Sequence, residues 1–394
     1  MAARTTSLLG NAVAPVALAF AVLDLTGSVT DLGLVVASRS VANVVLLLVG
    51  GVLADRLPRH LLLTGASVAA AGTQGAVAAL VLTGTAGVPL LVALSVANGA
   101  VSAVALPAAS ALTPQTVAPD ALQAANAVLR IGSNGSAILG AAVGGIAVAA
   151  VGPGWGLAID AASFLLAAGM FRAIRLARAA PRQETTSVLA ELRAGWGEFR
   201  SRRWVWIVVL QFAVVNAAFI GAVTVLGPVV ADATVGRAAW GIVLAAEAVG
   251  LLGGGVLALR WAPRRALGIG VAASATLAAP VLALAVVAGH DVEGLPAAVV
   301  LVAAGLLSGV AVEQFAIAWD VSLQQHVPPD RLARVYSYDA LGSIVAVPVG
   351  EVAVGPLAGA VGVVPALLGC AVAIVVATGA ALSTRSVRTL ERLR

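Results

Sequence analysis

The residues best suited to chemistry lie in one short charged loop and at a few isolated positions inside long apolar runs. The loop, residues 51–60, contains Gly51, Asp55, Arg56 and Arg59. Its charges and its proline interrupt the apolar runs on either side, which predicts a turn between two helices. Carboxylate and guanidinium groups form charge-assisted hydrogen bonds across helix ends. We therefore expect Asp55 to take part in a clasp that gates one face of the molecule; the alternative is a locally paired loop without gating.

Ionisable residues inside the apolar runs form the second group of candidates. Buried charge is costly in a membrane, so such residues are functional candidates by default. The candidates for coupling or substrate binding are Arg39, Asp160, Glu247, Glu313 and Glu351. A carboxyl group in an apolar cavity can load and release protons near neutral pH, which makes Glu247 and Glu313 the preferred proton carriers. Arg39 and Asp160 are expected to pair, because two buried opposite charges would otherwise be uncompensated.

Other polar residues in the runs have two interpretations. Asn98, Asn134 and Asn216 either contact a substrate or form hydrogen bonds between helices, as do Gln211 and Gln314. Asp320, Asp339 and Arg130 lie nearer the ends of their runs, where interfacial pairing is the simpler role. Small residues allow helices to approach closely, and the glycines expected at such contacts are Gly132, Gly140, Gly144, Gly145, Gly350 and Gly355.

The composition indicates the structures that must position these residues. Apolar residues make up 60% of the chain and charged residues 10%, against about 25% charged in ordinary soluble domains. The apolar runs are too long and too uniformly apolar for barrel strands, so the sequence predicts an all-α membrane protein. The twelve expected spans are 6–23, 31–53, 61–83, 87–110, 127–151, 156–177, 204–229, 237–259, 265–288, 295–320, 333–357 and 362–382.

The basic residues indicate how the chain crosses the membrane. All 23 are arginines, and apart from Arg39, Arg130 and Arg237 they lie in loops or at the ends of spans on one side of the membrane. Because cytosolic loops are enriched in basic residues, both termini and the 51–60 loop are expected in the cytosol of a cell (cytoplasmic or inner) membrane. Topology thereby explains the net charge of +5 without nucleic acid as a partner.

The two halves of the chain are similar in sequence. Gly99 aligns with Gly309 and Pro119 with Pro329, a shift of 210 residues that needs no gap over the following spans. We expect an N-terminal six-helix bundle (1–177), a cytosolic linker (178–203) and a C-terminal six-helix bundle with a short tail (204–394). A parallel repeat implies a pseudo-two-fold axis along the membrane normal, a binding cavity and alternating access.

The pattern Gly51-Val52-Leu53-Ala54-Asp55-Arg56-Leu57-Pro58-Arg59 resembles the signature loop of the major facilitator superfamily, and a weaker copy stands at 255–265. The segments around 106–166 resemble the bacterial exporter branch that includes enterobactin and macrolide efflux proteins. The resemblance implies the twelve-helix major facilitator fold. The sequence differs from the pattern of the family's drug antiporters at two positions. Ser95 stands where they have an arginine in span four, and Ala141 stands where they have a proline in span five.

These observations predict a secondary active transporter rather than an enzyme. The three histidines lie in separate loops, and no zinc, phosphate-loop or nucleophile motif is present. We expect no cofactor and no metal. The partners expected are a small-molecule substrate, a proton or other coupling ion, and the lipid bilayer around a monomer. The expected activity is export of small amphipathic or lipophilic molecules, such as drugs, antibiotics or siderophore-like compounds. The alternatives are transport of a small polar metabolite and a membrane scaffold or receptor on the same fold.

Overall fold

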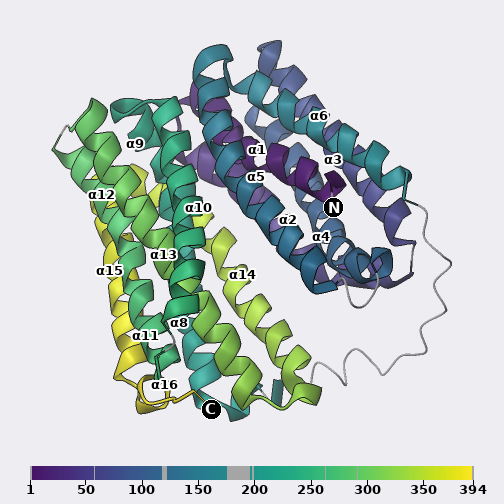
Figure 1. Cartoon of the computed structure of the whole chain (residues 1–394). Coiled ribbons are helices and arrows are strands. Elements are labelled where there is room, and N and C mark those ends of the chain that lie inside the picture. The colour runs from purple at the N-terminus through teal and green to yellow at the C-terminus, as the bar shows by residue number, and fades with distance from the viewer. Residues whose placement is uncertain are drawn as a thin grey trace. The chain divides into compact units, whose positions relative to one another are not determined.

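The computed structural model describes residues 2–392 except 57, 118–121, 175–195, 198, 262 and 291. Every regular element among these residues is helical (Figure 1). The prediction of an all-helical chain is therefore confirmed.

Six long helices come from the first half of the chain. They are α1 (Ala2–Thr26), α2 (Val29–Arg56), α3 (Arg59–Leu82), α4 (Val88–Thr116), α5 (Leu122–Val151) and α6 (Pro153–Arg172). The turn between α5 and α6 is made by Gly152, whose φ of 89° suits glycine because a side chain is strained there. Pro153 follows it in the first turn of α6, where a missing N–H costs no helical hydrogen bond.

The second half contains shorter pieces as well as long helices. They are α8 (Arg203–Gly221), α9 (Gly227–Thr234), α10 (Arg237–Arg260), α11 (Ala266–Ala273), α12 (Ala278–Gly289), α13 (Gly294–His326), α14 (Pro329–Val361), α15 (Val363–Ser383) and α16 (Arg385–Arg388). A π-helical turn, Ala222–Leu226, joins α8 to α9, and a 3-10 turn, Ser274–Leu277, joins α11 to α12.

Prolines explain why two predicted continuous spans are interrupted. Pro228 follows the π-helical turn, and Pro280 follows the 3-10 turn. A proline has no N–H and its ring clashes with the carbonyl group four residues earlier. In both cases that carbonyl belongs to the π-helical or 3-10 turn. The altered hydrogen-bonding pattern of the turn therefore accommodates the proline within a span.

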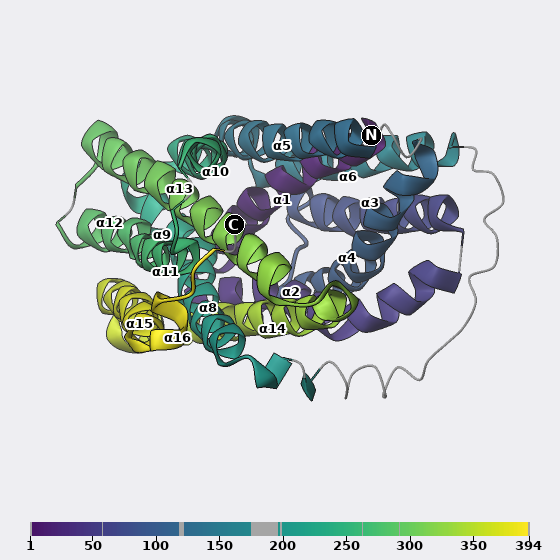
Figure 2. The same cartoon turned by 60° about the horizontal axis from the view of Figure 1, so that its bottom comes forward.

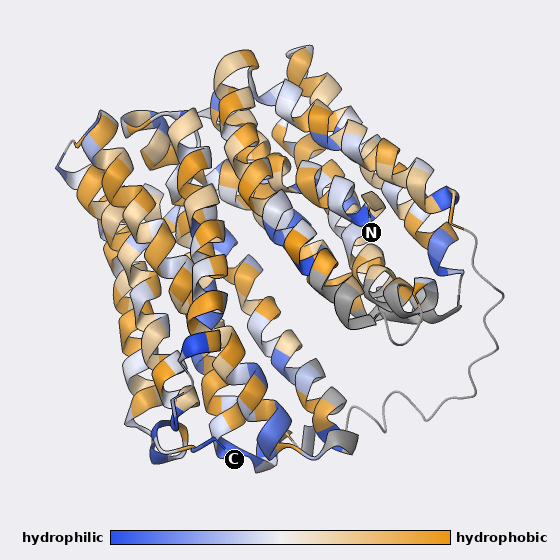
Figure 3. Ribbon diagram, viewed as in Figure 1, coloured by the Kyte–Doolittle hydropathy of each residue, from blue (hydrophilic) through white to orange (hydrophobic). Residues whose placement is uncertain are grey.

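Twelve helices among the described residues are long and apolar enough to cross a membrane. This is the number that the sequence predicts. Figure 3 shows these ribbons mostly in the orange of apolar residues, with blue residues frequent in the turns. Large apolar side chains lie on the surface, among them Leu259 at 87% and Leu295 at 77% exposure. Such surfaces are unfavourable in water and expected against lipid.

Packing divides the chain into two compact units, which are described separately. Unit 1 comprises Met1–Ala179, Thr224–Ala245 and Glu293–Ala298, and unit 2 comprises Ala180–Val223, Ala246–Val292 and Val299–Arg394. The predicted boundaries 1–177, 178–203 and 204–394 stay a prediction, and most of the predicted linker lies outside the described residues.

In unit 1, α1 packs against α5 and α6, α2 against α4, and α3 against α4 and α6. Figures 1 and 2 both show α1 beside α5 and α6. Glycines permit the close approach of α1 and α5. A Cβ on Gly132 would lie 2.6 Å from Thr5 Oγ1, one on Gly140 would lie 2.6 Å from the Leu9 carbonyl oxygen, and one on Gly144 would lie 3.1 Å from Val13 Cα.

In unit 2, α8 packs against α14 and α15, and α12 packs against α15. Gly350 of α14 lies directly on the backbone of α8, where an added Cβ would overlap the Ala217 carbonyl oxygen. Gly355 is buried further along α14. Trp204, Val205, Phe315, Trp319 and Leu323 form part of the apolar core at the end of this unit that contains the starts of α8 and α14. This core supports one side of the pocket described below.

Candidate functional site

The charged segment 51–60 lies where two helices meet, as predicted, but most of it is helical rather than a loop. Helix α2 continues to Arg56 and α3 begins at Arg59. The side chains of residues 48–57, which include Asp55 and Arg56, lie outside the described part of the structure. The clasp of Gly51, Asp55, Arg56 and Arg59 therefore stays a prediction.

Unit 1 contains a wholly buried carboxylate, Asp160 of α6, which is 0% exposed. Its Oδ2 accepts a 2.6 Å hydrogen bond from Gln74 Nε2 of α3. Its Oδ1 has no hydrogen-bond partner among the described residues. The hydroxyl of Ser163 donates to the backbone carbonyl oxygen of Asp160 at 2.7 Å, not to the carboxylate. Asp160 is therefore a buried group with one acceptor atom still available for a proton.

Helices α1 and α2 complete the surroundings of this carboxylate. Arg39 Nη2 of α2 donates to Asn11 Oδ1 of α1 at 2.8 Å. Gly10 of α1 lies against the same place, since a Cβ there would overlap Ser163 Oγ and lie 2.9 Å from Asp160 Oδ1. The pairing of Arg39 with Asp160 stays a prediction, and the hydrogen bonds described at these two residues involve Asn11 and Gln74.

The polar amides in the spans mostly join pairs of helices. Asn98 Nδ2 of α4 donates to Thr73 Oγ1 of α3 at 3.1 Å. Asn216 Nδ2 of α8 donates to the Ser343 carbonyl oxygen of α14, also at 3.1 Å. Asn98 Oδ1 is buried without a partner among the described residues, so this amide keeps an acceptor for a ligand. Asn134 is half-buried on α5.

The three glutamates occupy different places in unit 2. Glu247 is half-buried on α10 and Glu313 is half-buried on α13, whereas Glu351 of α14 is 3% exposed. Glu313 lies against α10, because a Cβ on Gly254 would lie 2.7 Å from Glu313 Cβ. Among the described residues there is no group of three or more His, Cys, Asp or Glu that could hold a metal ion. Each glutamate is therefore considered by itself as a candidate for coupling or substrate binding.

Unit 2 contains a pocket of about 220 Å³ lined by α8, α13 and α14. Apolar side chains form most of its wall, and Asp320, Asp339 and Ser343 supply polar atoms. The rings of Phe212 and Phe315 stack with centroids 4.2 Å apart and planes 7° apart. The ring of Trp319 lies nearly parallel to that of Phe315, at 6.3 Å and 9°. The pocket thus combines three aromatic rings with two carboxylates.

Neutral donors hold the two carboxylates at the pocket. Trp319 Nε1 donates to Asp339 Oδ2 at 2.9 Å, and the hydroxyl of Tyr336 donates to Asp320 Oδ1 at 3.1 Å. The sequence suggests interfacial pairing for Asp320 and Asp339, and it does not indicate that these two carboxylates share a pocket with aromatic rings. One signal is available in the sequence, because Phe315 and Trp319 are one helical turn apart and Asp320 follows directly. The contribution of Asp339 depends on how α13 and α14 pack.

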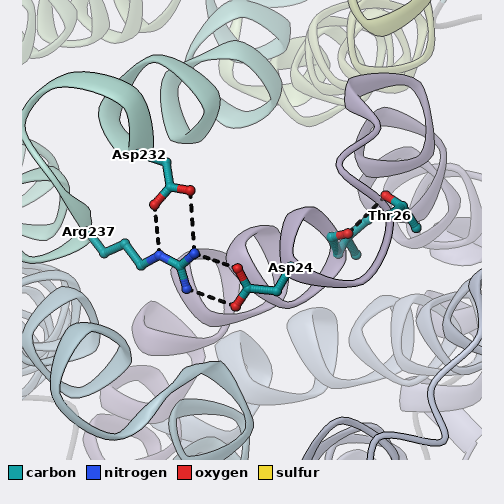
Figure 4. Close-up of polar contacts among 5 residues, drawn as sticks. Asp24, Thr26, Asp232 and Arg237 are labelled. Carbon is teal, nitrogen blue, oxygen red and sulfur yellow. Dashed lines mark hydrogen bonds and ion pairs between the residues drawn. The ribbon is translucent and has the colours of Figure 1, made fainter.

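A second polar cluster in unit 1 joins the end of α1 to α9 and α10 (Figure 4). Arg237 donates from Nη1 to Asp24 Oδ2 and from Nε to Asp232 Oδ1, both at 2.8 Å. Its Nη2 donates to the other oxygen of each aspartate. The guanidinium carbon also lies 4.8 Å from the centre of the Phe20 ring. The sequence does not indicate that these three charges meet, because Asp24 and Arg237 are 213 positions apart.

Comparison with known proteins identifies the family. The family model described as Major Facilitator Superfamily matches residues 1–350. No curated protein sequence matches the chain. Among solved structures, the nucleoside transporter NupG has a TM-score of 0.76 at 15% identity, covering 97% of this chain and 96% of that one. The xylose transporter XylE from E. coli, in an inward open conformation, has a TM-score of 0.69 at 15% identity, covering 99% and 95%.

A bacterial homologue of the human lysosomal transporter Spinster is also similar, with a TM-score of 0.71 at 15% identity and coverage of 98% and 95%. Likeness at these identities concerns the fold, whereas the family model matches most of the sequence. The twelve apolar helices agree with both findings. The chain therefore belongs to the Major Facilitator Superfamily and is a multi-pass membrane transporter.

Proposed function

We propose that this protein exports small amphipathic or lipophilic molecules and is driven by a proton gradient through alternating access. The observation that carries the proposal is the pocket of unit 2, whose wall is largely apolar and aromatic with a few polar atoms. Small-molecule sites of this composition bind apolar bodies and use the polar atoms for orientation. The buried carboxylate of Asp160 supports proton coupling, because it offers an acceptor inside the core of unit 1.

Reconstituted flux tests this proposal. The purified full-length chain is placed in proteoliposomes with an acidic lumen, and uptake of chloramphenicol, ethidium, uridine and xylose is measured. We expect accumulation of the amphipathic compounds that a protonophore abolishes. Flux of uridine or xylose alone, in either direction across the vesicle membrane, would support the alternative of a polar-metabolite transporter, which is favoured by the likeness to NupG and XylE. Absence of flux for a broad panel would support a scaffold or receptor.

The proposed topology places the protein in the cell membrane as a monomer with both termini in the cytosol. The argument is the arginine content of the loops on one side of the spans. Under this topology the cluster of Arg237, Asp24 and Asp232 faces outward, and the charged segment 51–60, which contains Asp55, faces the cytosol. External protease should leave tags at both termini intact in whole cells; removal of either tag would contradict this topology.

Two charged groups are proposed to gate opposite faces. Arg237 links α1 with α9 and α10, whereas Asp55 is expected to clasp the cytosolic ends of helices. The side chain of Arg237 is 22% exposed and those of Asp24 and Asp232 are 42% and 40% exposed. Exposed pairs contribute about 0–1 kcal/mol each, enough to shift a balanced two-state equilibrium without unfolding the protein.

We therefore expect Arg237→Gln and Asp55→Asn to shift access in opposite directions. The reporter is Ala21→Cys in a Cys370→Ala background, because Ala21 is 3% exposed and lies one turn before Asp24. An impermeant maleimide applied outside should label this cysteine faster in Arg237→Gln and more slowly in Asp55→Asn than in the parent. Equal labelling in all three proteins would contradict the gating role of both groups. Asp31→Asn, at the start of α2, is the charge-matched control.

A further inference from the structure

We propose that the pocket between α8, α13 and α14 selects small organic cations that carry an apolar, preferably aromatic, body. This inference rests on the proposed transport function and names its substrate class. It is carried by the juxtaposition, inside one unit, of three near-parallel aromatic rings with Asp320 and Asp339.

The aromatic side chains favour a cation with an apolar body. Phe212, Phe315 and Trp319 line the pocket. The face of an aromatic ring carries partial negative charge and attracts a cation, most strongly for tryptophan and in a desolvated site. The same faces stack with flat apolar groups. The faces of these rings do not stabilise an anion. A polyhydroxylated sugar would lose hydrogen bonds to water without replacing them.

The carboxylates strengthen the selection for positive charge. The hydrogen bonds to Asp320 and Asp339 come from the neutral donors Tyr336, Trp319 and Ser343. Arg237 and Arg265 form ion pairs with Asp24, Asp232 and Glu391, and not with the pocket aspartates. Both carboxylates line the same pocket, where two like charges repel each other when both are ionised. A bound cation would relieve this repulsion, which is how complementary charge produces specificity.

The size of the pocket limits the cation. A volume of about 220 Å³ lies below the roughly 300–1,000 Å³ typical of sites for drug-sized ligands. A quaternary ammonium group attached to a single aromatic ring is of suitable size. Phenyltrimethylammonium is such a compound, and tert-butylbenzene has the same shape with a carbon atom in place of the charged nitrogen. The pair therefore separates the contribution of charge from that of apolar contact.

Direct binding to the purified full-length chain tests the proposal by titration calorimetry with each probe. Phenyltrimethylammonium should bind at least about tenfold more tightly than tert-butylbenzene, a difference of about 1.4 kcal/mol. Asp339→Asn and Asp320→Asn should each remove most of this preference while leaving tert-butylbenzene binding unchanged. Both substitutions keep an acceptor oxygen for Trp319 or Tyr336. Glu391→Gln, which removes an exposed carboxylate paired with Arg265 in the same unit, should leave both affinities unchanged.

Three results would overturn the proposal. The first is equal affinity for the charged and neutral probes. The second is unchanged cation binding in both aspartate variants when size-exclusion profiles show them folded. The third is complete displacement of phenyltrimethylammonium by sodium ions at equal concentration, which would indicate an inorganic cation site. Because binding is measured without a gradient, failure of the transport proposal would appear separately, as absence of flux with cation binding intact.

Discussion

Gly145→Ala is expected to reduce the transport rate by roughly tenfold, with a smaller effect on expression. Gly145 of α5 and Gly241 of α10 meet backbone to backbone within unit 1. A Cβ on Gly145 would lie 2.7 Å from Gly241 Cα and 2.8 Å from the Arg237 carbonyl oxygen. No side chain can rotate away to relieve this overlap, so the helices themselves must separate. Overpacking of this kind costs about 1–3 kcal/mol, and 1.4 kcal/mol corresponds to a factor of ten.

The same helix provides the control for this prediction. Gly135 lies ten residues earlier on α5, and a Cβ there would meet no atom within 4 Å. Gly135→Ala adds the same methyl group and the same helix propensity, and should transport like the parent. Gly241→Ala should behave like Gly145→Ala, because its Cβ would lie 2.5 Å from the Ala141 carbonyl oxygen. Equal rates for the Gly145 and Gly135 variants would show that the close approach is not needed for transport.

Asp160→Asn is expected to abolish proton-driven accumulation while leaving downhill flux measurable. The carboxylate is wholly buried, and its Oδ1, which has no hydrogen-bond partner among the described residues, lies close to Gly10 in the core of unit 1. Asparagine has nearly the same shape, and its amide oxygen can still accept from Gln74 Nε2, so the local packing is retained. It cannot exchange a proton, and the coupling of proton movement to transport should therefore be lost.

The measurement compares accumulation with and without an acidic lumen in proteoliposomes. The ratio should be well above one for the parent and for Asp31→Asn, and close to one for Asp160→Asn. An unchanged ratio in Asp160→Asn would remove this residue as the proton carrier. Glu247→Gln and Glu313→Gln would then be tested in the same assay, since both glutamates are half-buried in the spans of unit 2.

The two polar clusters of unit 1 show where prediction from sequence ends. The sequence singles out Arg39 and Asp160 because each is an ionisable residue in an apolar run. It does not indicate that Gln74, which lies 86 positions from Asp160, supplies the hydrogen bond to its carboxylate. Likewise, Arg237 and Asp24 are separated by 213 positions and yet form an ion pair. Periodicity reports the faces of single helices but not which helices meet.

Sequence alone determines the helical class, the twelve spans and the short loop between α2 and α3 of this transporter. It does so because hydrophobic length, proline and charge act locally along the chain. Tertiary structure alone decides that Phe212, Phe315 and Trp319 stack beside Asp320 and Asp339. That pocket requires α8, α13 and α14 to pack at one particular register, and register depends on the fit of many side chains and glycines at once.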